Sequence, residues 1–133
     1  MKIYCCQCGK DVEARLTNGA EIYPHREDLD SLPFWIHDEC SNFVGCHHKT
    51  PQRKNPLGCI PTKEIRNARK HIHALLDPMW KTATMKKRGQ LYAEISSKLG
   101  YQFHTAEIRS IEEARRIYRI ILNISKKPLT INF

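Results

Sequence analysis

Residues 34–40, with the sequence FWIHDEC, and residues 4–9, with the sequence YCCQCG, decide the fold. Each stretch holds two metal-binding side chains separated by two residues: His37 with Cys40, and Cys5 with Cys8. A two-residue gap lets a tight turn direct both side chains at one ion, and two such turns supply the four ligands of a closed structural zinc site. The spacing therefore predicts one structural zinc, bound by three thiolates and one imidazole.

Other interpretations of these cysteines remain open. They are also compatible with a redox pair or with small buried hydrophobic side chains. A disulfide framework is disfavoured because the N-terminus does not resemble a secretory signal peptide. The donors that compete with the predicted ligands are Cys6, Cys46, His47 and His48. The last three predict a second metal site, a thiol–imidazole pair or, as we favour, a buried Cys46 beside exposed histidines.

Positive charge is concentrated in the second half of the chain. The 133 residues carry a formal net charge of +8. Residues 1–61 hold 7 Lys and Arg against 8 Asp and Glu, whereas residues 62–133 hold 15 against 6. No apolar run approaches the roughly 20 residues that a membrane-spanning helix needs. We therefore expect a cytoplasmic protein with a near-neutral metal-binding lobe and a basic half.

The first half of the chain has the pattern of short strands. Residues 12–16 alternate as a half-buried strand does, and residues 17–19 form an Asn-Gly turn that favours a hairpin with a second strand over residues 20–23. Phe43 and Val44 predict a further strand. The proline-rich residues 51–61 predict a linker or an ordered loop. Together these features predict a zinc-ribbon-like lobe over residues 1–50.

The second half has the pattern of three helices. Apolar residues at helical spacing predict helices over residues 63–76, 85–99 and 111–123, the first ended or kinked by Asp77-Pro78 and the third preceded by a capping box. Residues 101–105 predict a short strand or an extended connection, and residues 126–133 predict an edge strand or a frayed tail. The expected architecture is a single α+β domain over residues 1–133, with the basic helical half over residues 62–133.

Several of these motifs together resemble a known family. They are the CxxCG stretch, residues 23–26 (YPHR), Phe34-Trp35 before a ligand pair, residues 44–47 (VGCH), and residues 56–58 (PLG). This combination is similar to a family of small bacterial and phage proteins that contain a zinc finger, and the similarity spans nearly the whole chain. In that family the second pair is usually Cys-x-x-Cys, whereas this chain has His37. The resemblance implies a zinc-binding fold and a phage origin, hence a location in the host cytoplasm, but no particular activity.

The basic helical half predicts binding to nucleic acid. Lys and Arg on exposed helix faces form an electrostatic surface suited to phosphate backbones. The chain shows no motif for base readout, so we expect contacts dominated by phosphate, with DNA and RNA both possible. The residues expected to make these contacts are Arg66, Arg69, Lys70, Lys86, Lys87, Arg88, Arg115, Arg116 and Arg119.

Two other function classes fit the same sequence. A small domain held by a metal, with uneven charge, could be an interaction factor or inhibitor that binds an acidic protein surface. A metal-supported nuclease is the third class, with imidazoles as bases, a guanidinium on phosphate and a carboxylate on a second metal. Its candidate residues are His25, Arg26, Asp28, His47 and His48. No intact hydrolase motif supports it, and four protein ligands would leave the predicted zinc no open position for water.

Overall fold

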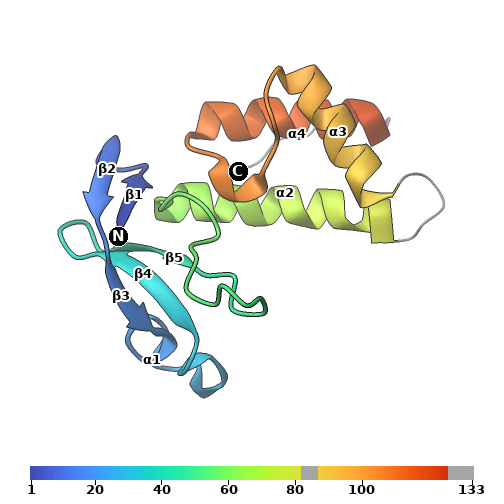
Figure 1. Cartoon of the computed structure of the whole chain (residues 1–133). Helices are drawn as coiled ribbons and strands as arrows, with labels where there is room; N and C mark the ends of the chain where they lie inside the picture. Colours follow the sequence, from blue (N-terminus) through green and yellow to red (C-terminus); the bar gives the residue numbers. More distant parts are fainter. Residues whose placement is uncertain (82–86, 126–133) are drawn as a thin grey trace. The chain divides into compact units, whose positions relative to one another are not determined.

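The computed structural model describes residues 1–81 and 87–125, and the chain forms two compact units (Figure 1). Unit 1 is Met1–Lys63 and unit 2 is Glu64–Phe133. Within the described residues, unit 1 holds all the strands and unit 2 holds nearly all of the three long helices. The fold is therefore α+β, as predicted. The predicted edge strand over residues 126–133 lies outside the described residues.

Unit 1 contains two small antiparallel sheets. Strand β1 (Lys2–Cys5) pairs with β2 (Lys10–Glu13). The second sheet has β4 (Pro33–His37) at its centre, between β3 (Arg15–Asn18) and β5 (Asn42–Gly45). Both predicted ligand pairs start at the last residue of a strand, since β1 ends at Cys5 and β4 ends at His37. Each pair thus occupies the turn of a hairpin.

The predicted hairpin around residues 17–19 is wrong. Strand β3 pairs with β4, and residues 20–23 do not form a strand, because helix α1 (Gly19–Ile22) begins there with the Asn18 side chain accepting from the Glu21 N–H at 3.2 Å. A Cβ at Gly19 would lie 1.8 Å from the carbonyl oxygen of Leu29. The glycine is therefore needed for close backbone packing and not for the positive φ that the Asn-Gly turn predicts. A short 3-10 helix, η1 (Glu27–Leu29), follows.

The predicted linker over residues 51–61 is an ordered loop that completes unit 1. Ile60 is fully buried in the unit 1 core, with Ile3, Val12, Ala14 and Val44. Its N–H donates to the Tyr4 carbonyl at 2.8 Å, and its carbonyl accepts from the Cys6 N–H at 2.9 Å. Trp35 Nε1 donates to the Lys54 carbonyl at 2.7 Å. The loop is thus held against both sheets.

Unit 2 is built from α2 (Lys63–Lys81), α3 (Arg88–Leu99) and α4 (Ile111–Ser125), and α3 and α4 lie on one side of α2 (Figure 1). Helix α2 runs through Pro78, beyond its predicted end, because its buried face continues through Leu76 and Met79. Helix α3 ends before Gly100, as predicted, whereas its predicted start at residue 85 lies outside the described residues. The third helix was predicted from residue 111 to residue 123, and α4 extends it by two residues.

Loop residues as well as helix faces form the core of unit 2. The largest of its fully buried side chains are Ile72, Leu76, Leu91, Ile95, Phe103, Ile108, Ile117 and Ile121. Residues 101–105 form no strand, and the Phe103 N–H donates to Ser96 Oγ at 2.9 Å. A 3-10 helix, η2 (Thr105–Glu107), follows. Ser110 caps α4, since Ser110 Oγ accepts from the Glu113 N–H at 3.1 Å, and Glu113 Oε1 accepts from the Arg109 N–H at 2.7 Å. No helix among the described residues is long and apolar enough to cross a membrane.

Candidate metal centre

The first ligand pair lies in a tight turn between β1 and β2. Cys5 is buried at the end of β1, and Cys8 is exposed in the turn. The Gly9 N–H donates to the Cys5 carbonyl at 2.9 Å, and Gly9 has a φ of +69°. Glycine adopts this left-handed conformation without steric cost. We call residues 5–9 the first knuckle.

The second pair lies in an equivalent turn between β4 and β5. His37 is buried at the end of β4, and Cys40 is partly buried in the turn. The Ser41 N–H donates to the His37 carbonyl at 2.8 Å, and Ser41 has a φ of 62°. Residues 37–41, the second knuckle, therefore repeat the backbone geometry of the first.

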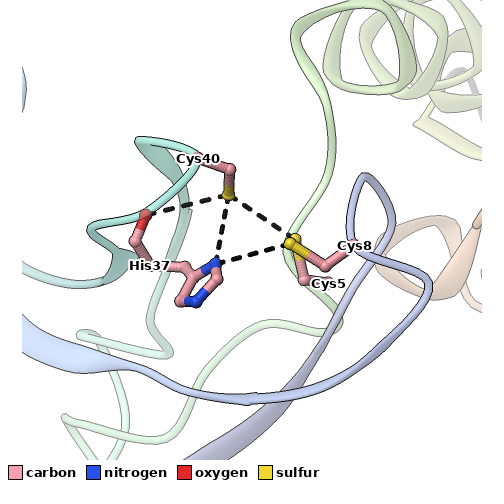
Figure 2. Close-up of side chains that lie close together, drawn as sticks. All are labelled: Cys5, Cys8, His37 and Cys40. Carbon is pink, nitrogen blue, oxygen red and sulfur yellow. Dashed lines mark hydrogen bonds between the residues drawn. The ribbon is translucent and has the colours of Figure 1, made fainter.

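The four donor atoms converge as zinc ligands do (Figure 2). One ligand atom from each of Cys5, Cys8, His37 and Cys40 lies within 4.8 Å of the others. The Cys5 and Cys40 sulfurs are 3.7 Å apart, and His37 Nδ1 lies 3.6 Å from Cys8 Sγ and 3.3 Å from Cys40 Sγ. Tetrahedral zinc, with bonds of about 2.3 Å to sulfur and about 2.0 Å to nitrogen, gives edges of roughly 3.8 Å between sulfurs and roughly 3.5 Å between nitrogen and sulfur. The donor set therefore fits one structural zinc.

The orientation of His37 identifies its ligand atom. Nδ1 faces the two cysteine sulfurs, whereas Nε2 faces the Glu39 carboxylate at 3.9 Å. With Nδ1 on the metal, the neutral ring carries its proton on Nε2, directed toward Glu39. At 3.9 Å the two groups make no hydrogen bond, and the Glu39 side chain is exposed, so the position of the ring is set by the second knuckle.

The thiols are electrostatically linked to one another. Burial opposes ionisation of Cys5, but hydrogen bonds from the Cys8 N–H and the Cys40 thiol hold its pKa below the ordinary value. Desolvation and the neighbouring Cys5 raise the pKa of Cys8 to about 11. These groups cannot all carry negative charge at this separation unless a cation balances them, and zinc binding requires deprotonated thiols.

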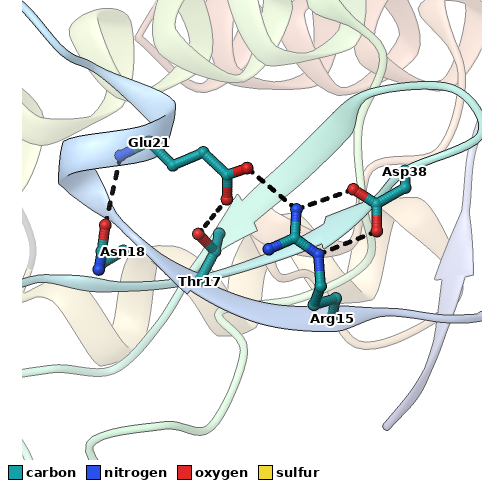
Figure 3. Close-up of polar contacts among 5 residues, drawn as sticks. All are labelled: Arg15, Thr17, Asn18, Glu21 and Asp38. Atoms are coloured by element: carbon teal, nitrogen blue, oxygen red, sulfur yellow. Dashed lines mark hydrogen bonds and ion pairs between the residues drawn. The ribbon is translucent and has the colours of Figure 1, made fainter.

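An exposed network of ion pairs binds Asp38 of the second knuckle (Figure 3). The Arg15 guanidinium donates to both Asp38 oxygens, from Nε at 2.9 Å and from its terminal nitrogen at 2.8 Å, and also reaches Glu21 at 3.0 Å. Thr17 donates to the same Glu21 carboxylate. Arg15 lowers the pKa of Asp38 and of Glu21 through these hydrogen bonds. Strand β3 and helix α1 are thereby tied to the residue next to His37.

The other predicted metal donors do not form a second site. Cys46 is buried and His47 is exposed, and burial raises the pKa of the Cys46 thiol. His48 Nδ1 lies 3.3 Å from the Cys46 carbonyl oxygen. Across residues 1–81 and 87–125, the zinc ligands are the one group of three or more metal donors found together. The buried Cys46 and the exposed His47 match the interpretation that we favoured, whereas His48 is half-buried and not exposed.

Among the candidate nuclease residues, Arg26 and Asp28 are in contact with each other. Arg26 donates to both Asp28 oxygens, at 2.9 and 2.8 Å, and both side chains are exposed. This pairing holds the pKa of Asp28 below its usual value. His25 and His47 are also exposed. The Arg26–Asp28 contact is thus a local ion pair within one loop.

Most of the predicted phosphate-binding residues are accessible, with one exception. Lys70, Lys87, Arg88, Arg115, Arg116 and Arg119 are exposed, and Arg66 is half-buried. Arg69 is buried and donates to the Ile108 carbonyl at 2.7 Å, so its prediction as a phosphate contact is wrong. Lys86 lies outside the described residues. The apolar spacing of α2 could have indicated the burial of Arg69, because Ile65, Ile72 and Leu76 share its face.

Two features of the site were not predicted from the sequence. The Arg15–Asp38 bridge joins residues that only the pairing of β3 with β4 brings together. The sulfurs of Cys6 and Cys59 lie 3.7 Å apart, although neither belongs to the zinc site. The segment after Cys46 carries no periodic signal that would place Cys59 beside the first knuckle.

The fold and the donor set define a zinc-binding protein with a ribbon-like lobe and two knuckles. A family model described as a zinc-finger-containing domain matches residues 1–126, and the chain belongs to that family. This agrees with the family resemblance of the sequence. Neither the curated proteins nor the solved structures gave a match.

Proposed function

We propose that the chain binds nucleic acid through phosphate contacts from unit 2, while the structural zinc stabilises unit 1. The observation that carries this proposal is the set of exposed cations along α2 and α4, of which Arg115 lines a groove between the two helices. The groove has a volume of about 320 Å³. It is lined by Glu64, Asn67, Ala68 and His71 from α2 and by Ile111 and Arg115 from α4.

Helical spacing sets cations in rows along these helices. Arg66 and Lys70 lie four residues apart along α2, and Arg115 and Arg119 lie four residues apart along α4. Side chains at these intervals share a helix face. A phosphate backbone lying along such a row could therefore contact more than one cation, and each contact releases condensed counterions.

The start of α3 offers a further phosphate contact. The Arg88 guanidinium lies 4.3 Å from the centre of the Tyr92 ring and 5.8 Å from that of Trp80. An arginine stacked on an aromatic face keeps the N–H groups at its edge available for bidentate contacts with phosphate. Arg88 thus remains a suitable ligand for an anion while its orientation is fixed.

The test measures binding of the full zinc-loaded chain to labelled single-stranded and double-stranded DNA and RNA by fluorescence anisotropy at several salt concentrations. The double variant Arg115→Gln, Arg119→Gln should bind more weakly and lower the salt slope by about 2, since each phosphate contact contributes about 0.9. Glu64→Gln should bind more tightly because it removes a carboxylate from the groove.

The matched control removes the same charge from unit 1, in the double variant Lys2→Gln, Lys10→Gln. Both lysines are exposed. If this control weakens binding as much as the α4 variant, or if binding does not depend on salt, the proposed surface is wrong. Capture of an acidic protein that survives nuclease digestion, without nucleic-acid binding, would favour the interaction-factor alternative. Under this proposal the protein acts in the cytoplasm, that of the host if a phage encodes it.

A further inference from the structure

Cys6 and Cys59 form a second pair of neighbouring thiols, separate from the zinc ligands. Their sulfurs are 3.7 Å apart. Cys59 is only 3% exposed, whereas Cys6 is partly exposed. The pair therefore combines one thiol that solvent reaches with one that solvent barely reaches.

One backbone bridge anchors the two segments that carry these residues. Cys5 and Ile60 form a parallel bridge, in which the Ile60 N–H donates to the Tyr4 carbonyl and the Ile60 carbonyl accepts from the Cys6 N–H. Cys6 lies in the turn that follows Cys5, and Cys59 lies in the bend that precedes Ile60. The distance of 3.7 Å between their sulfurs shows that the two side chains meet beside this bridge.

We infer that Cys6 and Cys59 are a disulfide-forming site that is oxidised while zinc stays bound. A disulfide bond is about 2.05 Å long, so the sulfurs must approach by roughly 1.7 Å, a shift within the range of a side-chain rotation. The zinc ligands on either side of Cys6, namely Cys5 and Cys8, are held by the metal. The paired thiols can therefore react without consuming a ligand.

The oxidant is a small-molecule disulfide such as oxidised glutathione. The thiolate of Cys6, the more accessible of the two, attacks one sulfur of the oxidant and releases one glutathione thiolate. The Cys59 thiolate then attacks Cys6 Sγ and displaces the second glutathione. The protein loses two electrons and two protons, and one oxidised glutathione becomes two reduced molecules.

The bond would covalently attach the loop that completes the unit 1 core to the first knuckle. At present, two backbone hydrogen bonds and the burial of Ile60 make that attachment. A crosslink between residues 6 and 59 removes disorder from the unfolded chain. Oxidation should therefore raise the thermal midpoint of the zinc-loaded protein and slow the loss of zinc to a chelator.

The test titrates full-length zinc-loaded protein with oxidised and reduced glutathione at fixed ratios. Proteolysis and mass spectrometry without reduction identify the linked cysteines, and a chromogenic chelator reports released zinc in the same samples. The expected result is one internal disulfide between Cys6 and Cys59, with the loss of two hydrogens, full zinc retention and reversal by dithiothreitol.

Matched variants show which cysteine attacks the oxidant and which one then closes the disulfide. Cys59→Ser should stop at a mixed disulfide between Cys6 and glutathione, Cys6→Ser should form neither product, and Cys46→Ala, which alters another buried cysteine, should form the same disulfide as wild type. A first disulfide that involves Cys5, Cys8 or Cys40 together with zinc release would overturn the inference. So would wild-type protein that shows no Cys6–Cys59 bond at any ratio.

Discussion

Gly9 and Ser41 occupy the same place in the two knuckles. Each has a positive φ, +69° and 62°, and each donates its N–H to the carbonyl of the first ligand in its turn, Cys5 or His37. The two halves of the zinc site thus use one backbone geometry. In the first knuckle a glycine adopts this left-handed backbone conformation without strain. In the second knuckle a serine adopts it at a cost in free energy.

This equivalence predicts opposite effects of two substitutions on the free energy of unfolding. Gly9→Ala should lower it by about 1 kcal/mol, because a side chain in left-handed backbone costs roughly that much. A Cβ at Gly9 meets no atom within 4 Å, so the effect comes from the backbone alone. Ser41→Gly should leave the unfolding free energy unchanged or raise it by up to about 1 kcal/mol. Urea unfolding of zinc-loaded protein measures both, and an unaffected Gly9→Ala would contradict the assignment.

The zinc content of single cysteine variants tests the ligand set. Cys8→Ser and Cys40→Ser should lose zinc and unfold unit 1, because the energy of metal binding is part of the folding energy. Cys6→Ser is the matched control and should retain one zinc per chain, since Cys6 lies outside the four-donor cluster. Elemental analysis of protein purified without added metal gives the answer. Zinc loss in Cys6→Ser alone would shift the ligand assignment by one residue.

Arg69 should contribute to stability and not to the binding of phosphate. Arg69→Met keeps an apolar side chain of similar length but leaves the buried Ile108 carbonyl without this donor. An unsatisfied buried group costs about 1–3 kcal/mol, so unfolding should require correspondingly less denaturant. Lys70→Met, on the exposed face one residue away, should change stability by less than about 0.5 kcal/mol. Equal stability of the two variants would contradict the buried role.

The environment of the Tyr101 hydroxyl predicts that the free energy of unfolding falls at high pH. Tyr101 is 47% exposed, but partial desolvation of its hydroxyl, together with the hydrogen bond that the hydroxyl donates to Glu113, raises the pKa of Tyr101 to about 12. The unfolded phenol has a pKa of about 10. The stabilising effect is therefore complete below pH 10 and is lost as the pH rises from about 10 to about 12, where the unfolded chain releases the proton first.

Tyr101→Phe isolates this effect. The variant should show a shallower loss of stability over that pH range, measured by urea unfolding at a series of pH values. The ultraviolet absorbance of tyrosinate should also lose a late-titrating component relative to wild type. Tyr4→Phe provides a control in unit 1. A pH profile for Tyr101→Phe identical to that of wild type would show that the hydroxyl is not held by Glu113.

The zinc ligands were predictable from the sequence because each knuckle is local. Two residues separate the ligands of each pair, and the turn that this spacing requires needs no distant partner. The three helices were predictable for the same reason, since their apolar periodicity and the capping residue Ser110 are local signals.

Features that depend on distant contacts were missed. The Asn18-Gly19 pair predicts a hairpin, but the close approach of the Leu29 backbone to Gly19 decides the local structure. Pro78 predicts the end of a helix, yet the burial of Met79 continues α2 past it. The loop ending in Ile60 was one of two interpretations of residues 51–61, and only its pairing with β1 shows that it belongs to unit 1.

Because Ile60 pairs with Cys5 across more than fifty residues, the chain can bind its metal during synthesis before the core of unit 1 is complete. All four ligands precede residue 41, so during synthesis they leave the ribosome well before Ile60, and domains commonly fold as the chain emerges. The zinc-bound turns can then form the template on which the later segment closes. A fragment cut after residue 50 would keep every ligand but expose the apolar surface that Ile60 covers, so an excised unit 1 must extend past that residue.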